Sequence, residues 1–292
     1  MPARVTLLHN PGAGFEQYTP EELIHELKKK GYDVHYASTK EDDYEQYLHA
    51  PGELVIVAGG DGTVQKISKY LVGRDIPIGL LPLGTANNIA TTLGIKGQPA
   101  EIIASWDLNR KKLFDVGILD GPKGRKYFVE AVGLGIFPKL IQKREKDDEE
   151  FDSREEELQD ALEHQQEILE KASSFKATLQ LDEEHLEDDY LLVEIMNIKF
   201  TGPNMDLAPK ADPGDGWFDV VVVKEHERKK FSAYLDACLR GIENSDQFKV
   251  HRAKNIEVTT ECSHYHIDDD TQKNKENRLN IELVPHGLQF LV

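Results

Sequence analysis

Residues 54–63 read LVIVAGGDGT, and this stretch decides the fold. Its first five residues are apolar, as in a short strand that is buried inside a sheet. The closely spaced glycines at positions 59, 60 and 62 let the backbone turn sharply, and the residues after them suit a helix. This order of strand, glycine turn and helix predicts one step of a parallel sheet that helices cover on both faces.

The same order extends over about the first 112 residues. Thr19 is predicted to cap a helix that ends at Gly31, with Pro20 at its first position and Glu22 returning the capping bond. Further strands are predicted at 5–9, 32–37 and 76–81, and further helices at 42–48, after Gly62 and at 86–93. Short connections between alternating strands and helices favour a parallel sheet.

The rest of the chain has strands that follow one another with turn residues between them. Strands are predicted at 112–119, 127–132, 175–181, 190–197, 217–223, 256–260 and 264–267, with one helix near 229–240. The turn cluster at 120–124 suits a hairpin. We therefore expect an α/β domain with a parallel sheet at 1–115 and a β-rich, mainly antiparallel sandwich domain at 116–285. The chain end, 286–292, is a candidate to return to the first domain.

An acidic segment at 143–171 interrupts the strands of the second domain. From Asp147 to Glu170 it carries twelve acidic residues and a single basic one, Arg154. Five of its apolar residues have helical spacing, namely Leu158, Ala161, Leu162, Ile168 and Leu169. We interpret the segment as a solvated helical insert with one face on the second domain. A partner-binding helix or a mobile lid is the alternative.

Composition excludes some functions. The net charge of −18 argues against nucleic acid as a main partner, because phosphate backbones are bound through positive patches. The 2 cysteines allow at most one bridge and suit a reducing cytoplasm. The first residues lack the apolar core of a signal peptide, and the longest apolar runs are too short to cross a bilayer. We therefore expect a cytoplasmic protein.

The glycine turn carries the clearest chemical signal. Backbone amides at the start of the following helix would point toward an anion, and the helix dipole favours negative charge there. Asp61 inside such a turn would repel a phosphate unless a cation lay between them, so it implies Mg²⁺ or a role in proton transfer. A tight turn in which Asp61 only caps a helix is the alternative.

Two more turns stand at strand ends. Residues 82–88 read PLGTANN, and residues 10–14 read NPGAG. Helix starts at the ends of neighbouring parallel strands converge on one crevice, where open α/β sheets bind ligands. Thr85 could bind a phosphate or a sugar, or could cap a helix, and NPGAG could also be a plain loop.

Together, NPGAG, GGDGT and PLGTANN resemble the ATP-binding set of the diacylglycerol-kinase catalytic family, which includes bacterial lipid kinases, sphingosine kinases and ceramide kinases. Residues 197–222 (NIKFTGPNMDLAPKADPGDGWFDVVV) are similar to the family's LAP segment and its DG-containing strand entry. Residues 284–292 are similar to its closing strand. The resemblance covers nearly the whole chain apart from the acidic segment.

The resemblance implies a nucleotide-binding fold of the NAD kinase and diacylglycerol kinase type, with ATP and Mg²⁺ as cofactors. The implied ATP-binding residues are Asn10, Pro11, Gly12, Ala13, Gly14, Thr39, Gly59, Gly60, Asp61, Gly62, Thr63, Val64, Gln65 and Thr85. The implied Mg²⁺ site is Asp215 with main-chain oxygens of Asp212 and Trp217. The family's late Asp-Gly-Glu motif corresponds to residues 268–270, so Asp270, or Asp268 beside it, is expected to accept the acceptor's proton, with Asp61 acting through Mg²⁺.

The chain departs from the family pattern at three places. Gln65-Lys66 and Asn87-Asn88 replace an Asn-Glu and an Asn-Asp pair, and Asp269-Asp270 replaces the Gly-Glu of the late motif. Asp270 is one methylene shorter than Glu, and a general base must come within hydrogen-bond reach of its proton. An acidic turn without a catalytic role is the alternative for residues 268–270.

The expected function is transfer of the γ-phosphoryl group of ATP to a hydroxyl of a diacylglycerol-like or sphingoid-like lipid. The expected pocket for this acceptor is apolar, with Phe200, Met205, Leu207 and Trp217 as its lining. Ordinary core positions are the alternative for these four residues. A lipid acceptor implies transient contact with a membrane surface. An NAD kinase-like enzyme and a non-catalytic nucleotide-binding or lipid-binding protein are the alternatives.

Overall fold

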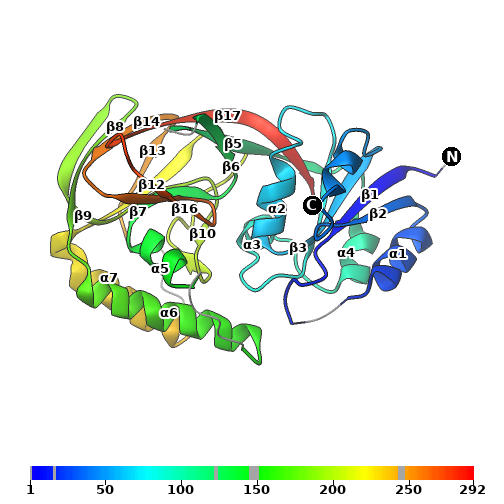
Figure 1. Cartoon of the computed structure of the whole chain (residues 1–292), viewed down its shortest axis with the longest axis horizontal. Coiled ribbons are helices and arrows are strands. Elements are labelled where there is room, and N and C mark those ends of the chain that lie inside the picture. The colour runs from blue at the N-terminus through cyan, green and yellow to red at the C-terminus, as the bar shows by residue number, and fades with distance from the viewer. Residues whose placement is uncertain (1, 16–17, 122–123, 145–150, 243–246) are drawn as a thin grey trace. The chain divides into compact units, whose positions relative to one another are not determined.

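The computed structural model describes residues 2–15, 18–121, 124–144, 151–242 and 247–292 (Figure 1). The chain forms two compact units, one of residues 1–114 with 286–292 and the other of residues 115–285. Residues 122–123 of the predicted hairpin turn and 145–150 of the acidic segment lie outside the described residues.

The first unit contains a parallel sheet in the order β4-β3-β1-β2. Its strands are β1 (Arg4–His9), β2 (Asp33–Ser38), β3 (Leu54–Gly59) and β4 (Ile78–Pro82). The last strand, β17 (Arg278–Leu291), joins this sheet where Phe290 pairs in parallel with Ile78. The predicted parallel sheet is therefore confirmed, and every residue of β3 is buried, as its apolar run requires.

The first unit's helices are α1 (Pro20–Lys29), the 3-10 turn η1 (Tyr44–Leu48), α2 (Asp61–Ser68), α3 (Asn88–Thr92) and α4 (Pro99–Ser105). Thr19 and Glu22 form the predicted capping box of α1. Three boundaries were wrong. The segment at 42–48 makes only a 3-10 turn, α2 begins at Asp61 rather than after Gly62, and left-handed Asn87 delays the start of α3.

The second unit is built from antiparallel strands. They are β5 (Lys111–Gly121), β6 (Gly124–Phe128), β7 (Ala131–Gly135), β8 (Phe175–Leu181), β9 (Glu184–Met196), β12 (Phe218–Lys224), β13 (Val250–Ala253), β14 (Asn255–Thr260), β15 (His264–Ile267) and β16 (Asp270–Lys273). A separate two-stranded ribbon joins β10 (Phe200–Thr201) and β11 (Met205–Asp206). The single strand predicted at 127–132 was wrong, because the amides of Val129 and Glu130 bind a side chain instead of a neighbouring strand.

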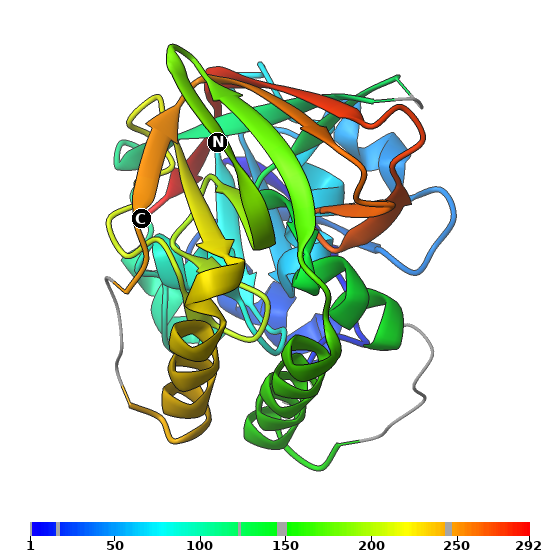
Figure 2. The same ribbon diagram turned by 90° about the vertical axis from the view of Figure 1, so that its left-hand side faces the viewer.

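The second unit holds more helix than predicted, namely α5 (Ile136–Arg144), α6 (Arg154–Lys171), the 3-10 turn η2 (Glu225–Glu227) and α7 (Arg228–Leu239). Figure 2 shows α6 and α7 side by side. Leu162 and Leu169 of α6 belong to a buried cluster that also includes Phe231 and Tyr234 of α7. Most of the apolar face of α6 is therefore used inside this unit.

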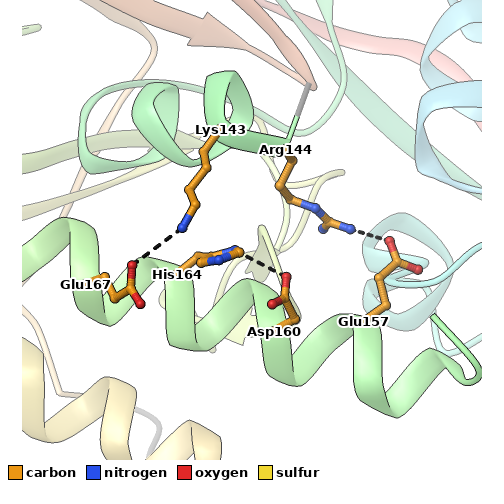
Figure 3. Close-up of polar contacts among 6 residues, drawn as sticks. All are labelled: Lys143, Arg144, Glu157, Asp160, His164 and Glu167. Carbon is orange, nitrogen blue, oxygen red and sulfur yellow. Dashed lines mark hydrogen bonds and ion pairs between the residues drawn. The ribbon is translucent and has the colours of Figure 1, made fainter. Parts of the chain in front are cut away.

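Charged residues join α5 to the polar side of α6 (Figure 3). Lys143 Nζ lies 3.5 Å from Glu167 Oε2, and Arg144 pairs with Glu157. Within α6, His164 Nδ1 lies 3.2 Å from Asp160 Oδ2. These pairs are partly exposed, so each contributes at most about 1 kcal/mol to stability.

Candidate functional site

The three strand-end turns meet at the carboxyl edge of the parallel sheet. Asn10 follows β1 and donates its amide to the Ala58 carbonyl of β3, at 2.9 Å. Leu83 follows β4 and donates its amide to the Gly59 carbonyl, at 3.0 Å. The NPGAG, GGDGT and PLGTANN motifs, far apart in sequence, therefore form one contiguous backbone surface.

Glycine is required where these turns touch. A Cβ on Gly84 would lie 2.3 Å from Gly60 Cα, and a Cβ on Gly60 would lie 3.0 Å from Gly84 Cα. Gly14 has a φ of +71°, and a Cβ there would lie 1.8 Å from the Leu83 carbonyl oxygen. The turns pack backbone against backbone, so no larger residue fits without moving the chain.

Asp61 has a structural role in this surface. Its Oδ2 accepts the Asn88 amide at 2.8 Å, and its Oδ1 accepts the Ile89 amide at 3.1 Å. The carboxylate thus caps the start of α3 and ties the GGDGT turn to the PLGTANN turn. The two amides of α3 offset part of its negative charge, and a direct role in metal or proton chemistry stays a prediction.

The other predicted nucleotide-binding residues divide into two groups. Asn10 Nδ2 donates to Thr63 Oγ1 at 3.3 Å, and half-buried Thr39 donates its amide to the His9 carbonyl at 2.8 Å. Asn10 and Thr39 lie just after strands β1 and β2, whereas Thr63 is a buried residue of α2. Val64 and Gln65 instead face the interior of the unit, because they lie on the buried side of α2.

Two residues of the first unit were missed by the sequence reasoning. Asn87 adopts a φ of 52°, accepts the Gly84 amide at 2.9 Å through Oδ1 and donates to the Gly84 carbonyl at 2.7 Å through Nδ2. Lys40 is exposed, and its Cε lies 3.4 Å from the position of a Cβ on Gly12. The preference of Asn for left-handed backbone could have identified Asn87. A lysine just after a strand gave no such signal.

In the second unit, Asp268 is buried in the turn between β15 and β16. Its φ is 51°, and its Oδ1 accepts the amides of Val129 at 3.1 Å and Glu130 at 2.9 Å. Its own amide donates to the Ala131 carbonyl at 2.8 Å. Asp268 therefore fixes the turn, while its neighbours Asp269 and Asp270 are exposed.

Asn197 also binds the segment between β6 and β7 that contains Val129 and Glu130. It follows β9, and its amide donates to the Glu130 carbonyl at 2.8 Å. Its Nδ2 donates to the carbonyls of Asp115 at 2.9 Å and Val129 at 3.0 Å. Its position at the head of the LAP segment was noted in the sequence, but its contacts were not predicted.

The predicted Mg²⁺ site combines one carboxylate, that of Asp215, with main-chain oxygens of Asp212 and Trp217. Asp215 pairs with the Arg252 guanidinium and accepts the Trp217 amide at 3.1 Å, and Asp212 accepts the Gly214 amide at 3.1 Å. Within the described part of the chain, no group of three or more His, Cys, Asp or Glu side chains could hold a metal ion. Asp215 is also paired with Arg252, and the Mg²⁺ site made of its carboxylate and the main-chain oxygens of Asp212 and Trp217 stays a prediction.

An apolar groove of about 780 Å³ lies in the second unit between α6, α7 and the β10–β11 ribbon. Of the predicted lining residues, Phe200 lies in its wall, whereas Met205 and Leu207 are buried in the core. The Trp217 ring lies elsewhere, with Lys254 Nζ 4.4 Å from its centroid. The groove is lined mainly by apolar side chains, among them Leu158, Leu162, Phe200, Pro203, Leu239 and Ile242.

Searching the described residues, we find no helix with the length and apolar character needed to cross a membrane. The predicted fold class, a parallel α/β domain with a β-rich sandwich domain, is confirmed. The crystal structure of an NAD kinase from Archaeoglobus fulgidus in complex with ATP has a similar fold, with a TM-score of 0.58, 13% identity, and coverage of 99% of this chain and 93% of that one.

Closer similarities are to diacylglycerol kinases. A crystal structure of such a protein from Bacillus anthracis gives a TM-score of 0.74 at 23% identity, over 99% of this chain and 96% of that one. A Mycobacterium tuberculosis protein named diacylglycerol kinase is 25% identical over 99% of this chain and 94% of its own length.

Two family models match along the chain. One describes the diacylglycerol kinase catalytic domain and matches residues 4–119. The other describes the YegS C-terminal NAD kinase beta sandwich-like domain and matches residues 150–292, a range that includes α6. The first model covers the three strand-end turns, and the second covers the Asp268 turn. The chain belongs to the diacylglycerol kinase catalytic-domain family.

Proposed function

We propose that this protein is an ATP-dependent lipid kinase that transfers the γ-phosphoryl group of ATP to a hydroxyl of a diacylglycerol-like or sphingoid-like acceptor. The observation that carries the proposal is the surface formed by Gly14, Gly60 and Gly84, whose turns leave no room for a Cβ. Such glycine turns at the carboxyl edge of a parallel sheet suit the phosphates of a nucleotide. The diacylglycerol kinase relatives support a lipid as the acceptor.

In this proposal the first unit binds ATP through backbone amides. Gly60 is the N-cap of α2 and has no side chain to accept the first amides of that helix, so these amides can bind a phosphate oxygen. Asp61 keeps the turns together, and exposed Lys40 beside Gly12 offers a positive charge. The Mg²⁺ that accompanies ATP neutralises charge on the transferred group.

The second unit would activate the acceptor. Asp270 is exposed and begins β16, where the backbone pairing of β15 with β16 fixes its position. Its carboxylate can take the proton of the acceptor hydroxyl as oxygen attacks the γ-phosphorus. Asp268 is a poorer base, because its Oδ1 already accepts two amides.

We assign the acyl chain of the acceptor to the apolar groove beside α6 and α7. Leu158 and Phe200 line this groove, and a fatty chain is an occupant that matches its apolar walls. Access to such an acceptor would come from transient contact with a membrane surface.

The test is transfer from γ-labelled ATP to acceptors in mixed detergent micelles, comparing diacylglycerol, a sphingoid base and free NAD. We expect a labelled lipid and no labelled NAD. A labelled NAD would assign the chain to the NAD kinases instead. ATP binding without transfer to any of the three acceptors, or to a total lipid extract, would contradict a lipid kinase.

A further inference from the structure

A buried acid–histidine pair lies directly behind the Asp268 turn. His266 of β15 and Glu194 of β9 are separated by one strand, β7, on which Gly133 pairs with both residues. The His266 Nε2 atom lies 2.8 Å from Glu194 Oε1, and the side chains are 4% and 0% exposed. The two side chains meet across β7, because the residue between them, Gly133, has no side chain.

Gly133 makes the contact possible. A Cβ at this position would lie 1.9 Å from Glu194 Oε2 and 2.6 Å from His266 Nε2. Thr201 of β10 donates a further hydrogen bond to Glu194 Oε1 at 3.3 Å, and the Phe137 ring of α5 packs edge-on against His266. The site is thus closed on several sides, and the imidazole has one orientation.

The other ring nitrogen reaches the acidic turn. His266 Nδ1 lies 2.8 Å from the Asp268 carbonyl oxygen, which can only accept, so Nδ1 must carry a proton. A second proton lies in the hydrogen bond between His266 Nε2 and Glu194 Oε1. Burial by itself lowers the pKa of His266, but the Glu194 carboxylate and the Asp268 carbonyl outweigh it and raise this pKa above its ordinary value. The contacts of both ring nitrogens therefore favour the protonated form of His266.

Asp268 needs this support because its backbone is left-handed, with a φ of 51°. A residue other than glycine in this region costs about 1 kcal/mol or more, and such strain persists only when surrounding contacts impose it. The Asp268 side chain and amide hold one side of the turn, through Glu130 and Ala131. Its carbonyl is held by His266, just before the chain reaches Asp270.

We propose that His266 is a positioning residue for phosphoryl transfer, and that Glu194, by orienting its imidazole, sets the Asp268–Asp270 turn. The proposal rests on the proposed function, since it assumes that this turn presents the carboxylate that accepts the proton. Neither residue touches the reacting atoms. They act through the Asp268 carbonyl on the direction of the Asp270 side chain.

Two substitutions separate the two nitrogens of the ring. His266→Gln places its amide nitrogen near the Nε2 position and loses the donor to Asp268, whereas His266→Asn keeps a donor near the Nδ1 position. We expect His266→Gln to lower kcat roughly 10- to 100-fold with little change in KM for ATP, because a small misplacement of a reacting group has this effect. His266→Asn combined with Glu194→Gln keeps the donor without a buried lone charge, so kcat should stay within about threefold of wild type.

The control is another acid–histidine pair of this unit, in which the histidine is buried and the acid, Glu184, is exposed. His251 Nδ1 lies 2.8 Å from Glu184 Oε2 and joins β13 to β9. His251→Gln should lower stability to a similar degree but leave kcat unchanged. Equal losses of kcat in His251→Gln and His266→Gln would overturn the proposal, because general destabilisation would then explain both.

A second readout does not depend on lipid transfer. Hydrogen exchange at the amides of Val129 and Glu130, which bind Asp268, should be faster in His266→Gln than in wild type and unchanged in His251→Gln. Unchanged exchange at both amides would overturn positioning, whereas absence of transfer by wild type would contradict only the proposed function. If His266→Gln does not fold, nitrogen NMR of wild type decides: an unprotonated His266 Nδ1 at neutral pH is incompatible with the proposal.

Discussion

In the first unit, the turns of Gly60 and Gly84 pack main chain against main chain, and the Asp61 carboxylate ties the two turns together. In the second unit, the turn that carries Asp270 is held by side chains, with the Asp268 carboxylate bound to an amide 138 residues earlier in the sequence. A surface made of backbone tolerates no added carbon atom. A turn made by side chains tolerates changes in its neighbours but depends on a few polar groups.

The difference teaches which parts of a site are visible in a sequence. Backbone contact requires glycine, and glycines in a short motif can be read directly from the residues. A side-chain contact such as that between Asp268 and Glu130 leaves no local pattern. We therefore expect the glycine turns to be sensitive to any added side-chain atom. The Asp268 turn should instead be sensitive to the loss of particular polar groups.

The largest effect is expected in the second unit. Asp270→Asn removes the proposed base from an exposed position, so kcat should fall by about 10²–10⁴-fold while the free energy of unfolding stays the same. Single-turnover transfer and chemical denaturation measure the two quantities.

Asp268→Asn is the matched control. Asn tolerates left-handed backbone and keeps an oxygen for the amides of Val129 and Glu130, so kcat should fall by less than about tenfold. If Asp268→Asn were the more harmful of the two, the base would be Asp268, and the turn would not be the side-chain scaffold described above.

The next effect tests the backbone surface of the first unit. Gly84→Ala places a Cβ 2.3 Å from Gly60 Cα. Relieving that clash should cost about 1–3 kcal/mol and raise the dissociation constant of ATP roughly 10- to 100-fold. Calorimetric titration with ATP provides the measurement.

Gly94→Ala gives the comparison for Gly84→Ala. Gly94 has a left-handed φ of +73°, unlike Gly84, and apart from its chain neighbours no atom lies within 4 Å of the position of its Cβ. The substitution should lower stability by about 1 kcal/mol without changing ATP affinity. An equal loss of ATP affinity in both variants would show that general destabilisation, rather than contact between the turns, is responsible.

The smallest effect concerns α6, which belongs to neither region. Arg144→Ala removes the ion pair with partly exposed Glu157, so stability should fall by less than about 1 kcal/mol. Leu162→Ala removes buried contact of the same helix and should cost about 2–4 kcal/mol. A greater loss from Arg144→Ala than from Leu162→Ala, in thermal or chemical denaturation, would mean that charge rather than burial fixes α6.

The parallel sheet and its turns could be predicted because each step depends on neighbouring residues. The apolar run of β3, the glycines after it and the Thr19 capping box all act within a few positions. The fold class followed from the same alternation of strands and helices, and the structure confirms it.

The remaining features depend on contacts between distant residues. Strand pairing is interrupted between β6 and β7, because the amides of Val129 and Glu130 donate to the Asp268 carboxylate. No sequence pattern near Val129 predicts this contact. Likewise, the role of Asp61 as a cap for α3 depends on where Asn88 lies in the folded unit. The pair of Glu194 and His266 depends on a glycine on the strand between them, which the sequence alone does not connect with either.

The end of β17 has a consequence for synthesis of the protein on the ribosome. Gln289 Nε2 donates to Asp75 Oδ1 at 2.7 Å across 214 residues, and the neighbouring Phe290 is fully buried beside Phe114. Strands β1 to β4 emerge first during translation, yet the outer edge of β4 remains uncovered until these late residues leave the exit tunnel. An uncovered edge can pair with other chains, so the nascent protein carries an aggregation-prone edge until β17 has been made. A chaperone that binds extended backbone would be needed most during that interval.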